Sequence, residues 1–269
     1  MRARIVVKNA SRLLSDANQR AVLSGKLLHR LATPWARVAT QRALAHYTEH
    51  VEDYESLVSM LDPGLWRETL EFSSRFRVDA RDKLRKCPVP FGGAGATELL
   101  YFLVRLKRPA IVLETGVAAG WSSAAILHGM AVNEVGHLFS SDFPYLRYRD
   151  AERYIGLLVP DEIRHRWTIL DQGDRSNLPR LLRMMNGDID LFHYDSDKSY
   201  SGRSSTYELI RERLAGDAVV IFDDIQDNSH FRDLVRTKNL AFHVFGYGRR
   251  YRKYLGVTGL DQLFSPSES

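Results

Sequence analysis

Residues 110–123 read AIVLETGVAAGWSS, and this stretch decides the fold. A short apolar run (110–114) leads directly into a loop that contains Gly116 and Gly120. Glycines at such a turn let the backbone bend sharply and let a ligand approach the main chain closely. The G-x-x-x-G spacing is not the G-x-G-x-x-G fingerprint of dinucleotide-binding proteins, and the acid at the strand end, Glu114, suits a cationic ligand. The stretch predicts a strand, a tight turn and a helix, with a ligand site at the turn.

The sequence beyond this stretch alternates β-type runs with helix-length segments. The further runs are HLFSS (137–141), RWTIL (166–170), IDLFHY (189–194), AVVIF (218–222), AFHVF (241–245) and KYLGV (253–257). Strands that alternate with helices indicate a parallel sheet covered on both faces. The last two runs are joined by a link too short for a helical crossover, so we expect an antiparallel hairpin at the sheet edge. The fold class is therefore α/β, Rossmann-like.

The first 87 residues show a different sequence pattern. Helical periodicity extends from Ser11 to Phe76 without a strand pattern, and residues 88–97 look like a linker. We therefore divide the chain into two parts. Residues 1–87 are a basic helical extension, expected to act as a lid or a dimer contact, and residues 88–269 are a ligand-binding domain. Residues 1–46 carry seven Arg and two Lys against one acid, Asp16. Such a leader fits a transit peptide, a surface for anionic lipid or nucleic acid, or a solvated helix face.

The bulk composition excludes several classes of protein. The chain has 269 residues and a single cysteine, Cys87, which excludes an internal disulfide framework and a multi-thiolate zinc site. No apolar stretch is long enough to span a membrane, and no secretory signal is evident. We expect a cytoplasmic location.

Two more acids follow strands in register with the glycine loop. The second predicted strand ends in Ser141-Asp142, and the third is followed by Gly173-Asp174. A carboxylate at Asp142 is placed to accept both hydroxyls of a ribose, and one at Asp174 is placed to contact an adenine amino group. Each alone is a common loop carboxylate in water, but three acids in order at carboxyl strand ends, where open sheets bind ligands, point to one site.

These motifs resemble a known family. The ETGVAAGWSS loop and the SSDFP and QGD segments are similar to those of class I S-adenosylmethionine-dependent methyltransferases, most of all the macrocin-type sugar O-methyltransferases, over residues 90–258. The resemblance implies a seven-stranded sheet whose last strand is antiparallel. It implies that Glu114, Gly116 and Ser122 hold the methionine end of the cofactor, Asp142 the ribose and Asp174 the adenine. Thr115, Gly120 and Asp195 complete the expected cofactor site.

A second group of acids follows the fourth and fifth strands, in HYDSDKSY (193–200) and FDD (222–224). Carboxyl ends of parallel neighbours meet, and buried like charges are costly unless a cation neutralises them. We expect Asp195, Asp223 and Asp224 to bind Mg²⁺, with Mn²⁺ or Ca²⁺ as substitutes. Asp197 is our first choice of general base. Lys198 is its competitor, because it occupies the position at which related enzymes often carry a His. The alternative is that these acids cap helices or line solvated turns.

The leading hypothesis is a metal-assisted O-methyltransferase acting on a sugar or glycosylated natural product, as a homo-oligomer. A catechol-like phenol is the nearest alternative acceptor. The basic leader and the GYGRRYRKY run (246–254) keep an RNA-modifying methyltransferase open. An NAD-dependent oxidoreductase is disfavoured by the missing fingerprint, and a non-catalytic relative by the acids at every strand end.

Overall fold

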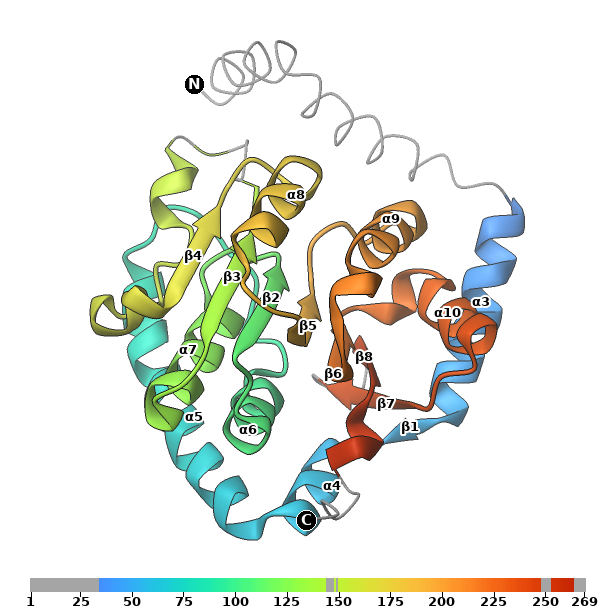
Figure 1. Cartoon of the computed structure of the whole chain (residues 1–269), viewed down its shortest axis with the longest axis horizontal. Helices are drawn as coiled ribbons and strands as arrows, with labels where there is room; N and C mark the ends of the chain where they lie inside the picture. Colours follow the sequence, from blue (N-terminus) through green and yellow to red (C-terminus); the bar gives the residue numbers. More distant parts are fainter. Residues whose placement is uncertain (1–33, 144–147, 149, 248–252, 264–269) are drawn as a thin grey trace.

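The computed structural model describes residues 34–143, 148, 150–247 and 253–263. Its centre is an eight-stranded sheet in the order β1-β7-β8-β6-β5-β2-β3-β4 (Figure 1). The strands are β1 (Val51–Glu52), β2 (Ile111–Thr115), β3 (His137–Ser141), β4 (Trp167–Leu170), β5 (Ile189–Tyr194), β6 (Leu214–Phe222), β7 (Phe242–Tyr247) and β8 (Lys253–Thr258). Seven of them coincide with the seven predicted runs. The Rossmann-like α/β class is confirmed.

The strand directions are as predicted, but the C-terminal hairpin does not lie where it was expected. All pairings are parallel except those of β8, which runs antiparallel to both β6 and β7. The predicted hairpin of the last two strands is present. It does not form the sheet edge, however, because β1 pairs in parallel with the outer side of β7.

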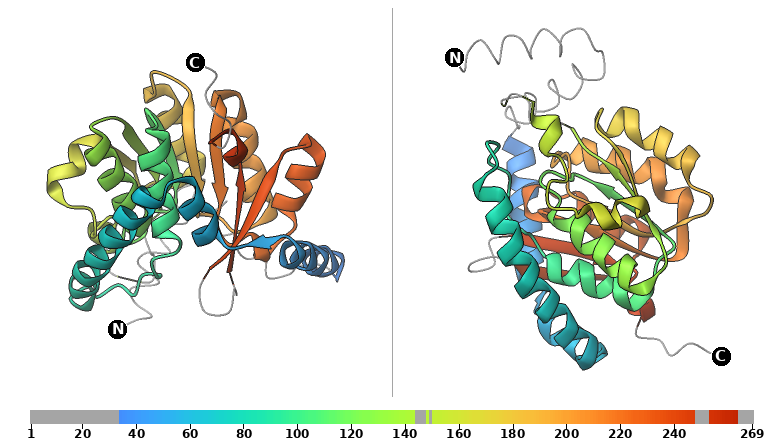
Figure 2. Two further views of the ribbon diagram at one scale, coloured as in Figure 1. Left: turned by 90° about the horizontal axis from the view of Figure 1, so that it is seen from below. Right: turned by 90° about the vertical axis from the view of Figure 1, so that its left-hand side faces the viewer.

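Helices cover both faces of the sheet (Figure 2). The α-helices are α3 (Pro34–Glu49), α4 (Tyr54–Leu61), α5 (Pro63–Arg85), α6 (Thr97–Lys107), α7 (Trp121–Asn133), α8 (Asp174–Met184), α9 (Tyr200–Ile210) and α10 (His230–Lys238). Short 3₁₀ turns are η1 (Ala151–Tyr154), η2 (Asp161–Arg166), η3 (Arg211–Arg213), η4 (Ile225–Asp227) and η5 (Leu260–Leu263). None of these described helices is long and apolar enough to cross a membrane.

Two apolar cores form because strand side chains alternate between faces. Val112 of β2 belongs to the core under α4–α7, whereas its neighbour Leu113 belongs to the core under α3 and α8–α10. Leu191 and Phe192 of β5 divide in the same way. Strands buried on both faces read as continuous apolar runs, which is why the sequence revealed them.

The N-terminal extension is built into the domain. Tyr47 of α3 is fully buried in one core, while Trp66 and Phe76 of α5 are buried in the other. Between these helices β1 continues the sheet, so the expectation of a purely helical extension is wrong at Val51–Glu52. The predicted helical segment before Thr33 lies outside the described residues.

Asp62 explains where the chain breaks inside this extension. Its backbone ends α4, and its side chain accepts a hydrogen bond from Leu65 N at 2.8 Å, which caps α5. Pro63 follows at the first helical position, where its missing N–H costs nothing.

Candidate active site

The glycine loop after β2 has the predicted tight geometry. Gly116 has φ +86°, and a Cβ there would lie 2.4 Å from the backbone oxygen of Asp195. The carboxyl ends of β2 and β5 therefore meet at this residue. The chain proceeds from β2 to β3 and β4 on one side and returns to β5 on the other, so this is the switch point of the sheet.

Gly120 serves a neighbouring segment. It begins α7 with φ +92°, and a Cβ would lie 2.9 Å from Gly156 Cα. Gly156 N donates to Ala118 O at 2.9 Å, which fixes the 156 segment against the loop. Gly120 thus permits close approach of protein backbone, and Ser122 lies buried in the first turn of α7.

Asp142 sits beside this loop at the end of β3. Its Oδ2 accepts a hydrogen bond from Ala118 N at 3.0 Å, and the residue is 9% exposed. Burial raises the pKa of Asp142 to about 7, although hydrogen bonds from Phe143 and Ala118 oppose the rise. The structure therefore places this carboxyl against the glycine loop, next to the turn at Gly116.

Glu114 points into the protein. Its Oε2 accepts hydrogen bonds from Ser123 Oγ at 2.6 Å and Ser140 Oγ at 2.8 Å, and the residue is fully buried. His193, its partner on β5, brings Nδ1 to 3.8 Å from Glu114 Oε1. Burial lowers the pKa of His193, but Glu114 and nearby acids raise it, and the net shift is upward. Through Oε2 the carboxylate fastens β2 to β3 and α7, while Oε1 has no hydrogen-bond partner among the described residues, and the cofactor role of Glu114 stays a prediction.

Asp174 joins three strand ends. Its carboxylate accepts hydrogen bonds from Ser141 Oγ at 2.6 Å and Ser196 Oγ at 2.5 Å. Ser196 Oγ also lies 3.1 Å from Thr115 Oγ1, which carries the contact to β2. Asp174 is thus linked through Ser196 to Thr115, one of the expected cofactor residues, and its carboxylate oxygens bind protein hydroxyls.

Asn177 is a residue that the sequence reasoning missed. It is fully buried, and its Nδ2 donates to Leu170 O at 2.8 Å and Asp142 O at 3.2 Å, while its Oδ1 accepts from Gln172 N. It thereby fixes the loop between β4 and α8. No sequence signal distinguishes it from other helical asparagines.

The predicted acid cluster is present. Oxygen atoms of Asp195, Asp223 and Asp224 all lie within 4.8 Å of one another. Asp195 follows β5, the other two follow β6, and Asp223 N donates to Tyr194 O across the strand ends. Burial, and then Asp223, raise the pKa of Asp195 to about 6.

Two lysines and a tyrosine approach the same oxygens. Lys198 Nζ contacts Asp195 Oδ1 and lies 3.3 Å from Asp224 Oδ2, while Lys253 Nζ lies 2.9 Å from Asp224 Oδ1. Tyr247 donates to Asp223 Oδ1. Burial raises the pKa of Asp224, but Lys198 and Lys253 outweigh it and lower the pKa to about 2. The hairpin residues Tyr247 and Lys253 were not predicted for the site.

The donor set fits a hard divalent cation, because three carboxylates converge at ligand spacing. An ion would take oxygens that Lys198, Lys253 and Tyr247 contact. The chain's own cations and a metal ion are therefore alternatives at this place.

Asp197 lies apart from these contacts. Its Oδ1 accepts from Ser199 N at 2.9 Å, and its carboxylate packs where a Cβ on Gly202 would meet it at 2.5 Å. Ser199, in turn, caps α9 by accepting from Gly202 N at 3.0 Å. Ser199 is thus the N-cap of α9, and Asp197 binds the backbone of that cap. Of the two predicted bases only Lys198 contacts the cluster.

Arg203 supports the turn that carries two of the acids. It is fully buried on α9, and its Nη2 donates to Asp223 O at 2.8 Å and Asp224 O at 2.9 Å. Asp224 has φ +52°, a conformation that costs energy for a non-glycine residue. The guanidinium holds this turn in place.

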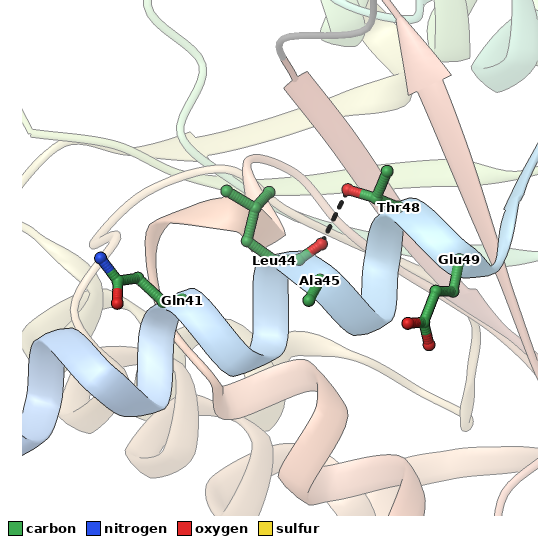
Figure 3. Close-up of a pocket in the computed structure, with 5 residues that line it drawn as sticks. All are labelled: Gln41, Leu44, Ala45, Thr48 and Glu49. Atoms are coloured by element: carbon green, nitrogen blue, oxygen red, sulfur yellow. Dashed lines mark hydrogen bonds between the residues drawn. The ribbon is translucent and has the colours of Figure 1, made fainter.

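A separate depression lies along α3, lined by Gln41, Leu44, Ala45, Thr48 and Glu49 (Figure 3). Thr48 Oγ1 donates to Leu44 O at 2.9 Å within it. It shares no residue with the glycine loop or the acid cluster, so we do not assign the cofactor to it.

Comparison with known proteins gives the site a context. A methyltransferase-domain family model matches residues 113–225. No curated protein matches the sequence.

Solved structures share the fold at low identity. Cofactor-bound Rv0187 from MTB is 14% identical (TM-score 0.55; 68% of this chain and 89% of that one). The O-methyltransferase TomG from Streptomyces achromogenes, in complex with S-adenosylmethionine, is 16% identical (TM-score 0.52; 71% of this chain and 95% of that one). A putative caffeoyl-CoA O-methyltransferase from Staphylococcus aureus is 11% identical (TM-score 0.51; 72% of this chain and 98% of that one). The chain therefore contains a stretch similar to a methyltransferase domain, on a fold that it shares with solved O-methyltransferases.

Proposed function

We propose that the chain transfers a methyl group from S-adenosylmethionine to a hydroxyl oxygen of a small acceptor, a sugar or a glycosylated natural product. The observation that carries the proposal is the meeting of Gly116, Asp142 and the acid cluster at one rim of the sheet, at its switch point. TomG, which shares the fold, was solved with S-adenosylmethionine.

The cofactor would lie over the glycine loop. Gly116 lets the ends of β2 and β5 meet closely beneath it, and Asp142 offers a carboxyl to the ribose hydroxyls. Alignment of the methyl group with the acceptor oxygen is the main task left to the protein.

The acid cluster would activate the acceptor. Asp195, Asp223 and Asp224 would hold a divalent cation, which when bound supplies Lewis acidity to the acceptor hydroxyl. Arg203, through the turn carbonyls, holds the segment that carries Asp223 and Asp224 in place.

Lys198 is the better placed of the two candidate bases. Burial lowers the pKa of Lys198, but Asp195, Asp223 and Asp224 raise it, and the net shift is upward. The ammonium is therefore the resting form, and the amine becomes available when these carboxylates engage another cation. Lys198→Met should bind cofactor normally and lose turnover, whereas Asp197→Asn should mainly weaken the start of α9. The opposite pattern would restore Asp197 as the base.

The acceptor is settled by a methyl-transfer assay with labelled S-adenosylmethionine and a panel of glycosides and phenols, with and without EDTA. We expect label on glycosides, loss of transfer with EDTA and recovery with Mg²⁺. Transfer that resists EDTA contradicts the metal assignment.

A phenol is the second candidate acceptor. It is favoured by the shared fold of a putative caffeoyl-CoA O-methyltransferase, because a caffeoyl group carries phenolic hydroxyls. Transfer to phenols alone would decide for it. Transfer to RNA, with binding that falls steeply as salt rises, would instead support the RNA alternative.

A further inference from the structure

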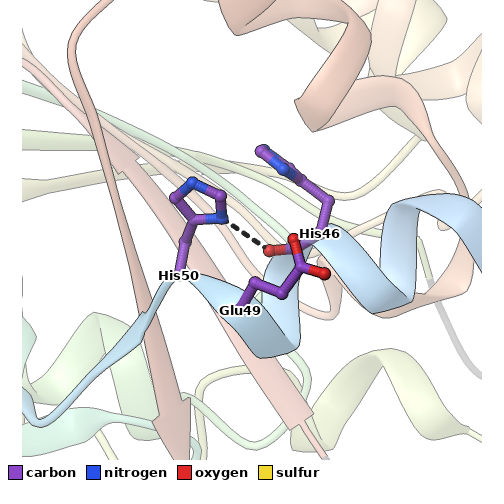
Figure 4. Close-up of side chains that lie close together, drawn as sticks. All are labelled: His46, Glu49 and His50. Atoms are coloured by element: carbon purple, nitrogen blue, oxygen red, sulfur yellow. Dashed lines mark hydrogen bonds between the residues drawn. The ribbon is translucent and has the colours of Figure 1, made fainter.

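The last turn of α3 gathers three side chains with metal-ligand chemistry. His46 and Glu49 lie in the last turn of α3 and His50 directly follows it, and one ligand atom from each lies within 4.8 Å of the others (Figure 4). Two histidines four residues apart on a helix share a face and bind zinc in this way in metalloproteins. The cluster belongs to a different element from the acids after β5 and β6.

His50 is held in the tautomer that a metal ligand needs. Its Nδ1 lies 2.8 Å from the backbone oxygen of His46 (Figure 4). A carbonyl oxygen can only accept, so Nδ1 carries the proton and Nε2 keeps its lone pair. Histidines that bind metals are commonly oriented by this bond from the other ring nitrogen to a carbonyl.

His46 has a ring nitrogen that the described protein groups leave unused. Its ring lies 4.2 Å from the ring of His50 and 5.7 Å from that of Phe242. Among the described residues its buried Nε2 has no hydrogen-bond partner. A polar atom in this state is costly unless something binds it.

We propose that His46, Glu49 and His50 form a site for a divalent transition-metal ion, with Zn²⁺ as the ion that fits best. Two imidazoles and one carboxylate are a known zinc donor set, and water completes the tetrahedron. Imidazole nitrogen favours Zn²⁺ over Mg²⁺, which prefers the all-oxygen donors of Asp195, Asp223 and Asp224. The chain thus carries a nitrogen-rich site and an oxygen-only site on separate elements.

The ion would fix a corner of the fold. His50 directly precedes β1, which closes the sheet edge beside β7. In the same turn, Tyr47 Oη accepts from Arg232 N at 3.1 Å and donates to Asn228 O at 3.4 Å, and Asn228 Nδ2 donates to Lys198 O. Zinc at this corner would therefore stabilise the α3–β1 junction and its contact with the segment behind Lys198.

The test is calorimetric titration of the tag-free, full-length protein with Zn²⁺. His50→Gln and Glu49→Gln remove ligands from exposed positions, so the fold should persist. His165→Gln is the matched control, because His165 is also exposed and its Nδ1 lies 2.9 Å from a backbone oxygen one turn earlier. Asp224→Asn controls for the acid cluster.

We expect one Zn²⁺ to bind the wild type and to bind each ligand variant about tenfold more weakly or worse, a loss that even outer-shell partners cause. His165→Gln should bind Zn²⁺ as the wild type does, and Asp224→Asn should keep the Zn²⁺ site that His50→Gln loses. Co²⁺ should give visible tetrahedral absorption bands in the wild type that His50→Gln lacks. Equal Zn²⁺ affinity in His50→Gln and the wild type, or loss of binding in Asp224→Asn alone, would overturn the proposal.

Discussion

Replacing Asp142 by Asn should make the ligand-free protein more stable at pH 8 while weakening its binding of S-adenosylmethionine. Burial raises the pKa of this carboxyl from 3.8 to about 7. At about 1.36 kcal/mol per pKa unit, that difference corresponds to roughly 4 kcal/mol. Because the folded-state pKa is the higher one, the folded protein holds the proton more tightly, and the stability this confers is lost as pH rises from about 4 through 7.

Asparagine removes this dependence because it stays neutral and can still accept from Ala118 N. Urea unfolding at pH 5 and pH 8 should therefore show a gain over wild type that is larger at pH 8, up to roughly 4 kcal/mol. Cofactor affinity should fall about tenfold to a hundredfold, since a hydrogen bond to a charged group contributes about 1.5–3 kcal/mol. Identical pH dependence in the two proteins, or unchanged cofactor affinity, would refute the reasoning.

Two further substitutions probe the scaffold of the site. Gly116→Ala should abolish cofactor binding and lower the melting temperature, because its Cβ would lie 2.4 Å from Asp195 O at a φ of +86°; normal titration with cofactor would contradict the close strand approach. Arg203→Leu should destabilise the protein by about 3 kcal/mol or more in urea unfolding, since two carbonyls lose charge-assisted hydrogen bonds. Arg211→Leu, at an exposed arginine just after α9, should change stability little; equal effects would argue against a special role for Arg203.

The sheet was predictable because its strands are buried on both faces and read as short apolar runs. The two-residue strand β1 was not, since Val51 and Glu52 show no run of their own. Their pairing depends on Val244 and Phe245, which come nearly two hundred residues later. Local sequence carries no information about such a partner.

The acid cluster was predictable for a geometric reason, since parallel neighbours bring their carboxyl ends together. The roles of Tyr247 and Lys253 were not predictable. They depend on the insertion of antiparallel β8 between β6 and β7, which is decided by tertiary packing and not by local sequence. The inward position of Glu114 follows from strand alternation, which directs it toward the same side as Val112 and onto α7.

Calorimetric titration with S-adenosylmethionine, run in parallel on the wild type and on Asp142→Ala, tests the central claim most directly. The account predicts one cofactor molecule per chain for the wild type, clearly weaker binding for the variant, and no binding of NADH by either. A wild type that fails to bind S-adenosylmethionine, or a variant that binds it equally well, would contradict the placement of the cofactor at the β2–β3 rim.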